Sequence, residues 1–189
     1  MIRTITRVVL ALSCSAATAA EVVPRDYVVL GRAGRPARGE LAIDPVASAI
    51  AAGSWSAPKA GDEVAWPDGS KRTWAEAKAK DDGTLDDPAA RSGYAYTEVE
   101  SAEARVMILE ASGHAMVFAD GEPRVGDPYG HGYVHLPVRL KAGKTGFLFR
   151  GGRGAPRAKL VEPKGKAQLD ASDATLPDII VGSSGDLTA

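Results

Sequence analysis

The sequence predicts an all-β protein, an antiparallel β-sandwich with one or two short helices. Two observations support this prediction. Short apolar runs, several of them alternating with polar residues, recur along the chain between turn residues. The 189 residues include 21 Gly and 12 Pro, which supply chain reversals between these runs. Short strands joined by such reversals, with no helix between them, are typical of two stacked antiparallel sheets.

The first residues, 1–20, have the form of a cleaved export signal. Arg3 and Arg7 carry positive charge, residues 8–12 are apolar, and residues 17–19 (ATA) match a small-residue cleavage site. The apolar stretch is too short to span a bilayer, and no later segment is long enough. We therefore expect a secreted or periplasmic protein with no membrane span. The net charge of −1 gives no reason to expect a nucleic-acid partner.

The single cysteine, Cys14, lies inside this signal, so the mature chain is expected to contain no disulfide and no thiolate metal site. A lipoprotein acylated at Cys14 is the alternative. It is the weaker one, because Leu12 stands one place away from the position that a lipidation motif requires.

The N-terminal part begins with residues 27–30 (YVVL), whose β-branched and aromatic side chains predict a strand. Residues 31–39 (GRAGRPARG) are glycine-rich like phosphate-binding loops. They lack the Gly-Lys-Ser/Thr ending, so we expect a solvated loop. Residues 46–52 predict a short helix at the edge of the sandwich, because Asp44 can cap its free amides and Pro45 suits its first position.

Residues 54–91 are polar and rich in turns. Pro-Asp-Gly at 67–69 predicts a turn, and residues 73–76 (TWAE) are expected to begin a brief helix. The acidic pairs at 81–82 and 86–87 fit a solvated loop better than the general acid and base of a glycosidase, which face each other across a cleft. Whether residues 21–91 belong to the sandwich or wrap around it stays open.

Residues 92–163 have the clearest strand patterns and form the predicted core of the sandwich. Strands are expected at residues 94–99, 105–110, 115–118, 122–125, 133–140, 145–150 and 158–161. The apolar run 105–110 suits a central strand buried on both faces. Asp120-Gly121 predicts a two-residue type I′ hairpin, and Pro137 predicts an edge strand or a bulge.

Residues 94–161 resemble the galactose-binding-like, carbohydrate-binding-module-type jelly rolls attached to secreted bacterial glycosidases, esterases and prolyl-oligopeptidase-type hydrolases. The resemblance covers a little over a third of the chain and rests on five segments in order: 94–96 (YAY), 105–109 (RVMIL), 117–122 (VFADGE), 136–143 (LPVRLKAG) and 147–152 (FLFRGG). It departs at Asp120 and near Thr145, where asparagine is usual. Both are turn positions, so the expected fold is unaffected. The resemblance implies an accessory jelly roll and assigns no ligand.

The candidate ligand site is the segment 127–133 (DPYGHGY), with Asp127, Tyr129, His131 and Tyr133 as its residues. Aromatic rings flanked by polar groups stack on the C–H faces of sugars and bond their hydroxyls. The alternative is that both tyrosines merely pack over the neighbouring hairpin.

No catalytic residue, metal or cofactor is predicted. The chain has no Gly-x-Ser-x-Gly motif, since residues 182–185 (GSSG) have the wrong spacing. The histidines are His114, His131 and His135. The last two would lie about 13 Å apart on a strand, too far to bind one zinc ion together.

Three hypotheses on function follow. The first is a secreted, non-catalytic accessory module with weak affinity for carbohydrate, whose partners are a glycan or a hydrolase catalytic domain. The second, the alternative to it, is that the chain is the N-terminal fragment of a secreted α/β-hydrolase. The C-terminal extension 164–189 motivates it, because its β-branched run at 179–181 looks like the start of a further element. The third is a solitary secreted β-protein acting in envelope assembly.

Overall fold

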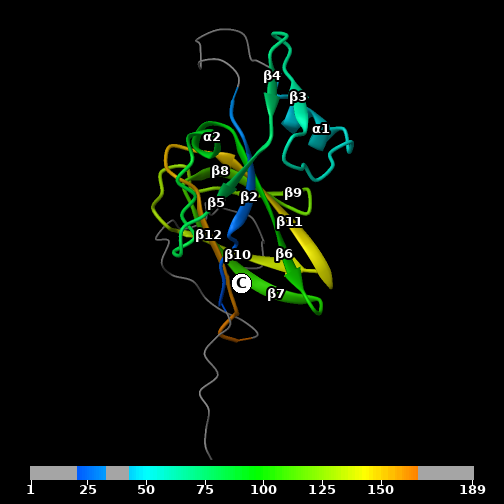
Figure 1. Ribbon diagram of the computed structural model, residues 1–189. Helices are drawn as coiled ribbons and strands as arrows, with labels where there is room; N and C mark the ends of the chain where they lie inside the picture. Colours follow the sequence, from blue (N-terminus) through cyan, green and yellow to red (C-terminus); the bar gives the residue numbers. More distant parts are fainter. Residues whose placement is uncertain (1–20, 33–42, 166–189) are drawn as a thin grey trace, which may run out of the picture.

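The computed structural model describes residues 21–32 and 43–165, which form two antiparallel sheets packed face to face and a separate hairpin (Figure 1). The predicted antiparallel β-sandwich is confirmed. The four-stranded sheet has the order β1 (Glu21–Val22), β12 (Arg157–Val161), β7 (Arg105–Ser112) and β10 (Val134–Leu140). The six-stranded sheet has the order β5 (Ala75–Lys78), β2 (Asp26–Leu30), β6 (Tyr94–Ser101), β11 (Gly143–Gly151), β8 (His114–Ala119) and β9 (Glu122–Val125).

The N-terminal part of the chain contributes strands to both sheets. β1 pairs with β12 in the four-stranded sheet, and β2 lies between β5 and β6 in the six-stranded sheet. The buried hydroxyl of Thr97 on β6 donates a hydrogen bond of 2.8 Å to the carbonyl of Asp26 on β2. The question left open by the sequence is thereby answered for these strands, which are part of the sandwich and do not wrap around it.

The main core fills the space between the two sheets. Each strand turns alternate side chains inward, as a pleated strand must. Phe147 and Phe149 on β11 and Val99 on β6 meet Leu109 on β7 and Leu160 on β12, all at most 3% exposed. Burial of this apolar surface is the main stabilising contribution to such a fold.

A second apolar cluster lies on the outer face of the six-stranded sheet. Leu30, Tyr94 and Leu148 are buried there beneath Val46 of helix α1 (Pro45–Ala51) and Trp74. The hairpin of β3 (Glu63–Ala65) and β4 (Lys71–Thr73) lies beside α1, at the upper right of Figure 1. This cluster explains how a short helix and a two-stranded hairpin, each unstable alone, hold their place on the sandwich.

Helix α1 follows the prediction closely. The Asp44 carboxylate accepts hydrogen bonds from the amides of Val46 at 3.0 Å and Ala47 at 3.2 Å, and Pro45 occupies the first turn. The Tyr94 hydroxyl donates a 2.7 Å hydrogen bond to the same carboxylate, which ties the helix start to the sheet. The capping residue therefore also fixes where the helix docks.

The brief helix predicted from residue 73 is wrong. Residues Lys71–Thr73 and Ala75–Lys78 are the strands β4 and β5, because β5 pairs with β2 and Trp74 is buried against the sheet. Tertiary pairing outweighs the weak helical pattern of this segment. A second helix does occur further on, as α2 (Pro88–Ser92), and Asp87 caps it by accepting from the amide of Ala89 at 2.7 Å.

Strand β7 is central, as predicted, but it is not buried on both faces. Its residues alternate, so that Met107 and Leu109 face the core while Val106 is 46% exposed. The four-stranded sheet has the main core on one side only, which leaves the other side of β7 in contact with water.

One turn prediction and one edge-strand prediction are confirmed. Ala119 pairs with Glu122 across Asp120 and Gly121, whose φ angles of +48° and +85° are those of a type I′ turn. Pro137 lies on β10, an edge strand of the four-stranded sheet.

Several predictions lie outside the described residues: the export signal with Cys14, most of the glycine-rich loop 31–39, and the extension from residue 166 onward. Within the described ranges, no helix has the length and apolar character needed to cross a membrane.

Candidate functional site

Three aromatic side chains stand next to one another on the loop between β9 and β10. The ring of His131 lies 5.9 Å from that of Tyr129 and 5.3 Å from that of Tyr133, and the latter pair is nearly parallel at 16°. The guanidinium of Arg153 lies 5.2 Å above Tyr129. We call Arg153, Tyr129, His131 and Tyr133 the aromatic ladder. The two tyrosines are 64% and 54% exposed, so the ladder is a solvent-facing feature.

Asp127 holds this loop from inside. It is 6% exposed, and its carboxylate accepts hydrogen bonds from the amides of His131, at 3.0 Å, and Gly132. Burial alone would raise the pKa of Asp127, but the amides of Gly132, His131 and Gly130 lower it below its ordinary value. The residue therefore remains a carboxylate that fixes the loop.

The structure brings all four predicted site residues together. Gly130 and Gly132 have φ angles of +73° and +78°, which let the loop bend so that alternate residues carry the rings. The sequence does not point to Arg153, because this residue lies in a separate glycine-rich turn. The Arg153 amide donates a hydrogen bond of 3.0 Å to the Pro128 carbonyl, which joins that turn to the loop.

His114 is buried close to this loop. It is fully shielded from solvent, and its ring meets Phe149 edge-on at 5.4 Å. The backbone of Ser112 and Val125 is near the ring, but neither ring nitrogen makes a hydrogen bond of good geometry. Burial lowers the pKa of His114, and the backbone of Ser112 and Val125 and the Asp127 carboxylate offset this only in part. The folded protein therefore holds the neutral imidazole.

The burial of His114 predicts a loss of stability in mild acid. Below pH of about 6.5 the unfolded chain takes up a proton at His114 that the folded state resists. The free energy of unfolding should then fall by at most about 1.4 kcal/mol per pH unit, until the pH passes the lower folded pKa. Urea unfolding of the wild type and His114→Leu between pH 7 and 5 checks this, with a flatter profile expected for the variant.

The exposed His131 supplies the control for that experiment. His131→Gln replaces an exposed side chain outside the core, so its unfolding profile should keep the wild-type slope. Equal slopes in the wild type and His114→Leu would show that the buried imidazole is not the source of the acid sensitivity.

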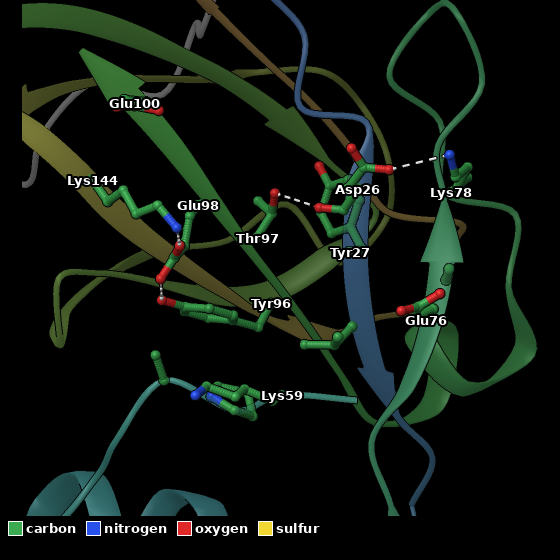
Figure 2. A pocket seen from close by; sticks show the side chains of 14 residues that line it. Asp26, Tyr27, Lys59, Glu76, Lys78, Tyr96, Thr97, Glu98, Glu100 and Lys144 are labelled. Carbon is green, nitrogen blue, oxygen red and sulfur yellow. Dashed lines mark hydrogen bonds and ion pairs between the residues drawn. The ribbon is translucent and has the colours of Figure 1, made fainter. Parts of the chain in front are cut away.

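A groove crosses the outer face of the six-stranded sheet, beside the segment that leads away from α1. Figure 2 shows the part of it lined by β2, β5 and β6. It consists of two adjoining cavities of about 670 and 730 Å³. Both are lined by Ala57, Tyr96, Glu98 and Lys144, which therefore mark the middle of what we call the sheet groove.

The middle of the sheet groove is a hydrogen-bonded network. The Tyr96 hydroxyl donates to Glu98 at 3.1 Å, and the Lys144 ammonium lies 2.7 Å from the other oxygen of that carboxylate (Figure 2). The hydrogen bond from Lys144 lowers the pKa of Glu98. Gly146 makes room for this arrangement, because a Cβ there would lie 2.6 Å from the Tyr96 hydroxyl.

Sequence reasoning missed the sheet groove, although one signal for it is present. Tyr96, Glu98 and Glu100 are two residues apart and therefore lie on one face of β6. The polar character of that face is visible in the sequence, whereas the neighbouring strands that complete the lining come from distant segments.

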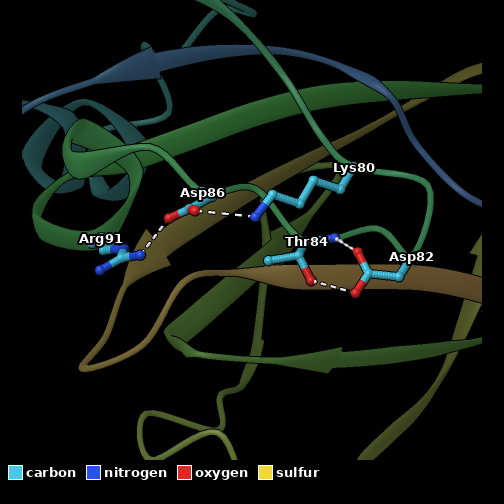
Figure 3. Close-up of polar contacts among 5 residues, drawn as sticks. All are labelled: Lys80, Asp82, Thr84, Asp86 and Arg91. Carbon is cyan, nitrogen blue, oxygen red and sulfur yellow. Dashed lines mark hydrogen bonds and ion pairs between the residues drawn. The ribbon is translucent and has the colours of Figure 1, made fainter.

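The acidic pairs at 81–82 and 86–87 have structural partners. Asp82 accepts from the amide and hydroxyl of Thr84, and Asp86 pairs with Lys80 at 3.1 Å and with Arg91 (Figure 3). These hydrogen bonds lower the pKa of both carboxyls. Each is therefore held as a carboxylate, whereas a glycosidase acid needs a raised pKa.

His131 and His135 contact different groups and do not face a common site. His131 is part of the aromatic ladder, and Nδ1 of His135 lies 3.7 Å from a carboxylate oxygen of Glu110 on β7. In the part of the chain that the structure describes, no group of three or more His, Cys, Asp or Glu side chains is placed to hold a metal ion. No family model, curated protein or solved structure matches the chain.

Proposed function

We propose that this protein is a secreted, non-catalytic accessory module of the galactose-binding-like type, which attaches a hydrolase to carbohydrate through the aromatic ladder. The export signal predicted at residues 1–20 and the resemblance of five segments to hydrolase-associated jelly rolls support the proposal from the sequence. The antiparallel sandwich supports it from the fold.

The observation that carries the proposal is that the ladder rings lie side by side on a hydrogen-bonded loop and are exposed to solvent. Exposed aromatic rings that lie next to one another form a contiguous surface, and contiguous exposed apolar surfaces mark interaction sites. Here the buried Asp127 fixes the loop, so little conformational entropy remains to be lost when a ligand binds.

The chemistry of the ladder suits a sugar. Tyr133 offers a ring for the C–H face of a pyranose, while the hydroxyls of both tyrosines and the Arg153 guanidinium can bond its oxygens. A binding surface made of two tyrosines and an arginine is also small, which agrees with the weak affinity expected from the sequence.

The test is binding of the full chain to immobilised and soluble glycans. Tyr129→Ala and Tyr133→Ala should each weaken binding by roughly tenfold or more, since a central aromatic contact contributes on that scale. Val125→Ala is the matched control, because Val125 is 64% exposed on the neighbouring strand β9 and lies outside the ladder. Unchanged affinity in both tyrosine variants, or no retention on any glycan, would refute the proposal.

A further inference from the structure

The sheet groove is long and runs across the strands of the six-stranded sheet. Its lining includes residues from β5, β2, β6, β11 and β8 in their spatial order. Neighbouring strands are about 4.8 Å apart, so five of them span about 19 Å. The groove is therefore shaped for an extended, chain-like ligand and not for a compact one.

Most charges in the groove are paired inside it. The pairs are Asp26 with Lys78 at 3.5 Å, Glu98 with Lys144 at 2.7 Å and Asp120 with Lys141 at 2.9 Å. The lining also contains Lys59, Glu76, Glu100 and Glu122, and the last pairs with Arg124 at 2.7 Å. The lining thus carries more carboxylates than ammonium groups, and three of the acidic side chains are paired with a lysine inside the groove, which favours a neutral polar ligand over an anion.

Apolar surface accompanies these polar groups. Ile50, Trp55 and Phe118 line the second cavity and are each partly buried. Trp55 is held in place by Trp74 and Tyr96, at ring distances of 6.2 and 6.4 Å. A partly exposed, fixed indole beside charged hydrogen-bonding groups matches the two faces of a sugar ring, one of C–H groups and one of hydroxyls.

A peptide strand fits this surface less well. Peptides that add to a sheet bond the unpaired backbone of an edge strand. Of the strands that line the groove, β5 is an edge strand at one end of it, whereas β2, β6, β11 and β8 are paired on both sides. The backbone along most of the groove is therefore already hydrogen-bonded within the sheet. The donors and acceptors of the lining are side chains, and hydroxyl groups can both donate to and accept from them.

We infer that the sheet groove is a second ligand site, which binds a segment of a neutral oligosaccharide chain. This inference shares the ligand class of the proposed function but uses a separate set of residues. The test is a titration of the isotope-labelled full chain, followed by NMR, with neutral tetra- to hexasaccharides of glucose, xylose, mannose and galactose. We expect shifts at the Trp55 indole N–H and at the amides of Glu98 and Lys144.

A pair of tryptophan substitutions separates groove binding from other effects. Ala57 is exposed and lines both cavities, so Ala57→Trp should obstruct the groove and weaken binding there by about tenfold or more. Ala60→Trp is the matched control, because Ala60 is also exposed but outside the lining, and its binding should be unchanged.

The same spectra distinguish the two sites. Shifts confined to Tyr129, His131 and Tyr133 would overturn the groove inference and leave the proposed function standing. Shifts in the groove that Ala57→Trp removes, with no shifts in the ladder, would support the groove inference and overturn the proposed function of the ladder. Groove shifts produced by extended neutral peptides and by none of the oligosaccharides would also overturn the inference.

Discussion

Replacing Phe147 by alanine is expected to lower the free energy of unfolding by about 3–5 kcal/mol. Phe147 is 1% exposed, near the middle of β11, and belongs to the core between the two sheets. Its strand is flanked by β6 and β8, whose pairing restricts collapse around the space that the ring leaves. The lost transfer free energy and the residual cavity therefore both contribute, and urea unfolding monitored by circular dichroism measures their sum.

Val106→Ala is the control for this substitution. Val106 lies on β7 in the other sheet and faces away from the core, so its truncation should change the free energy of unfolding by less than about 0.5 kcal/mol. If Phe147→Ala cost no more than Val106→Ala, the two sheets would not enclose a common core.

Replacing Gly93 by alanine is expected to cost about 3 kcal/mol or more. Gly93 caps the C-terminal end of α2 and leads directly into β6. A Cβ there would lie 1.9 Å from the Leu30 carbonyl oxygen and 2.9 Å from the Arg32 amide nitrogen. Both are backbone atoms at the end of β2, so the clash can be relieved only by moving that strand.

Gly53→Ala separates the clash from the general cost of replacing a glycine. Gly53 has a φ of +68°, but a Cβ there would meet no atom within 4 Å. Its substitution should cost only about 1–2 kcal/mol, the strain of a left-handed backbone. Thermal unfolding of both variants checks the difference, and equal costs would mean that the α2–β6 junction has room for a side chain.

Local signals in the sequence predicted many elements of the fold. The Asp120-Gly121 hairpin and the capped helix α1 were predicted because a few adjacent residues fix the backbone there. Residues 73–78 were mispredicted for the opposite reason, since their structure depends on pairing with β2, almost fifty residues earlier in the chain.

The candidate site shows the same division. The sequence singled out Asp127, Tyr129, His131 and Tyr133, because their residue types and spacing lie within one short segment. It did not reveal Arg153, nor that Asp127 holds the loop from inside, since both depend on which segments meet in space. The sheet groove was missed altogether, because its lining is assembled from at least five strands and the segment after α1.

The sequence by itself determined the strand periodicity, the tight turns and the helix caps, because backbone preferences and side chains a few residues apart decide them. Only the tertiary structure decided which face of each strand is buried, where the N-terminal strands pair and how the groove forms. These features depend on contacts between segments far apart in the chain, which a local pattern does not encode.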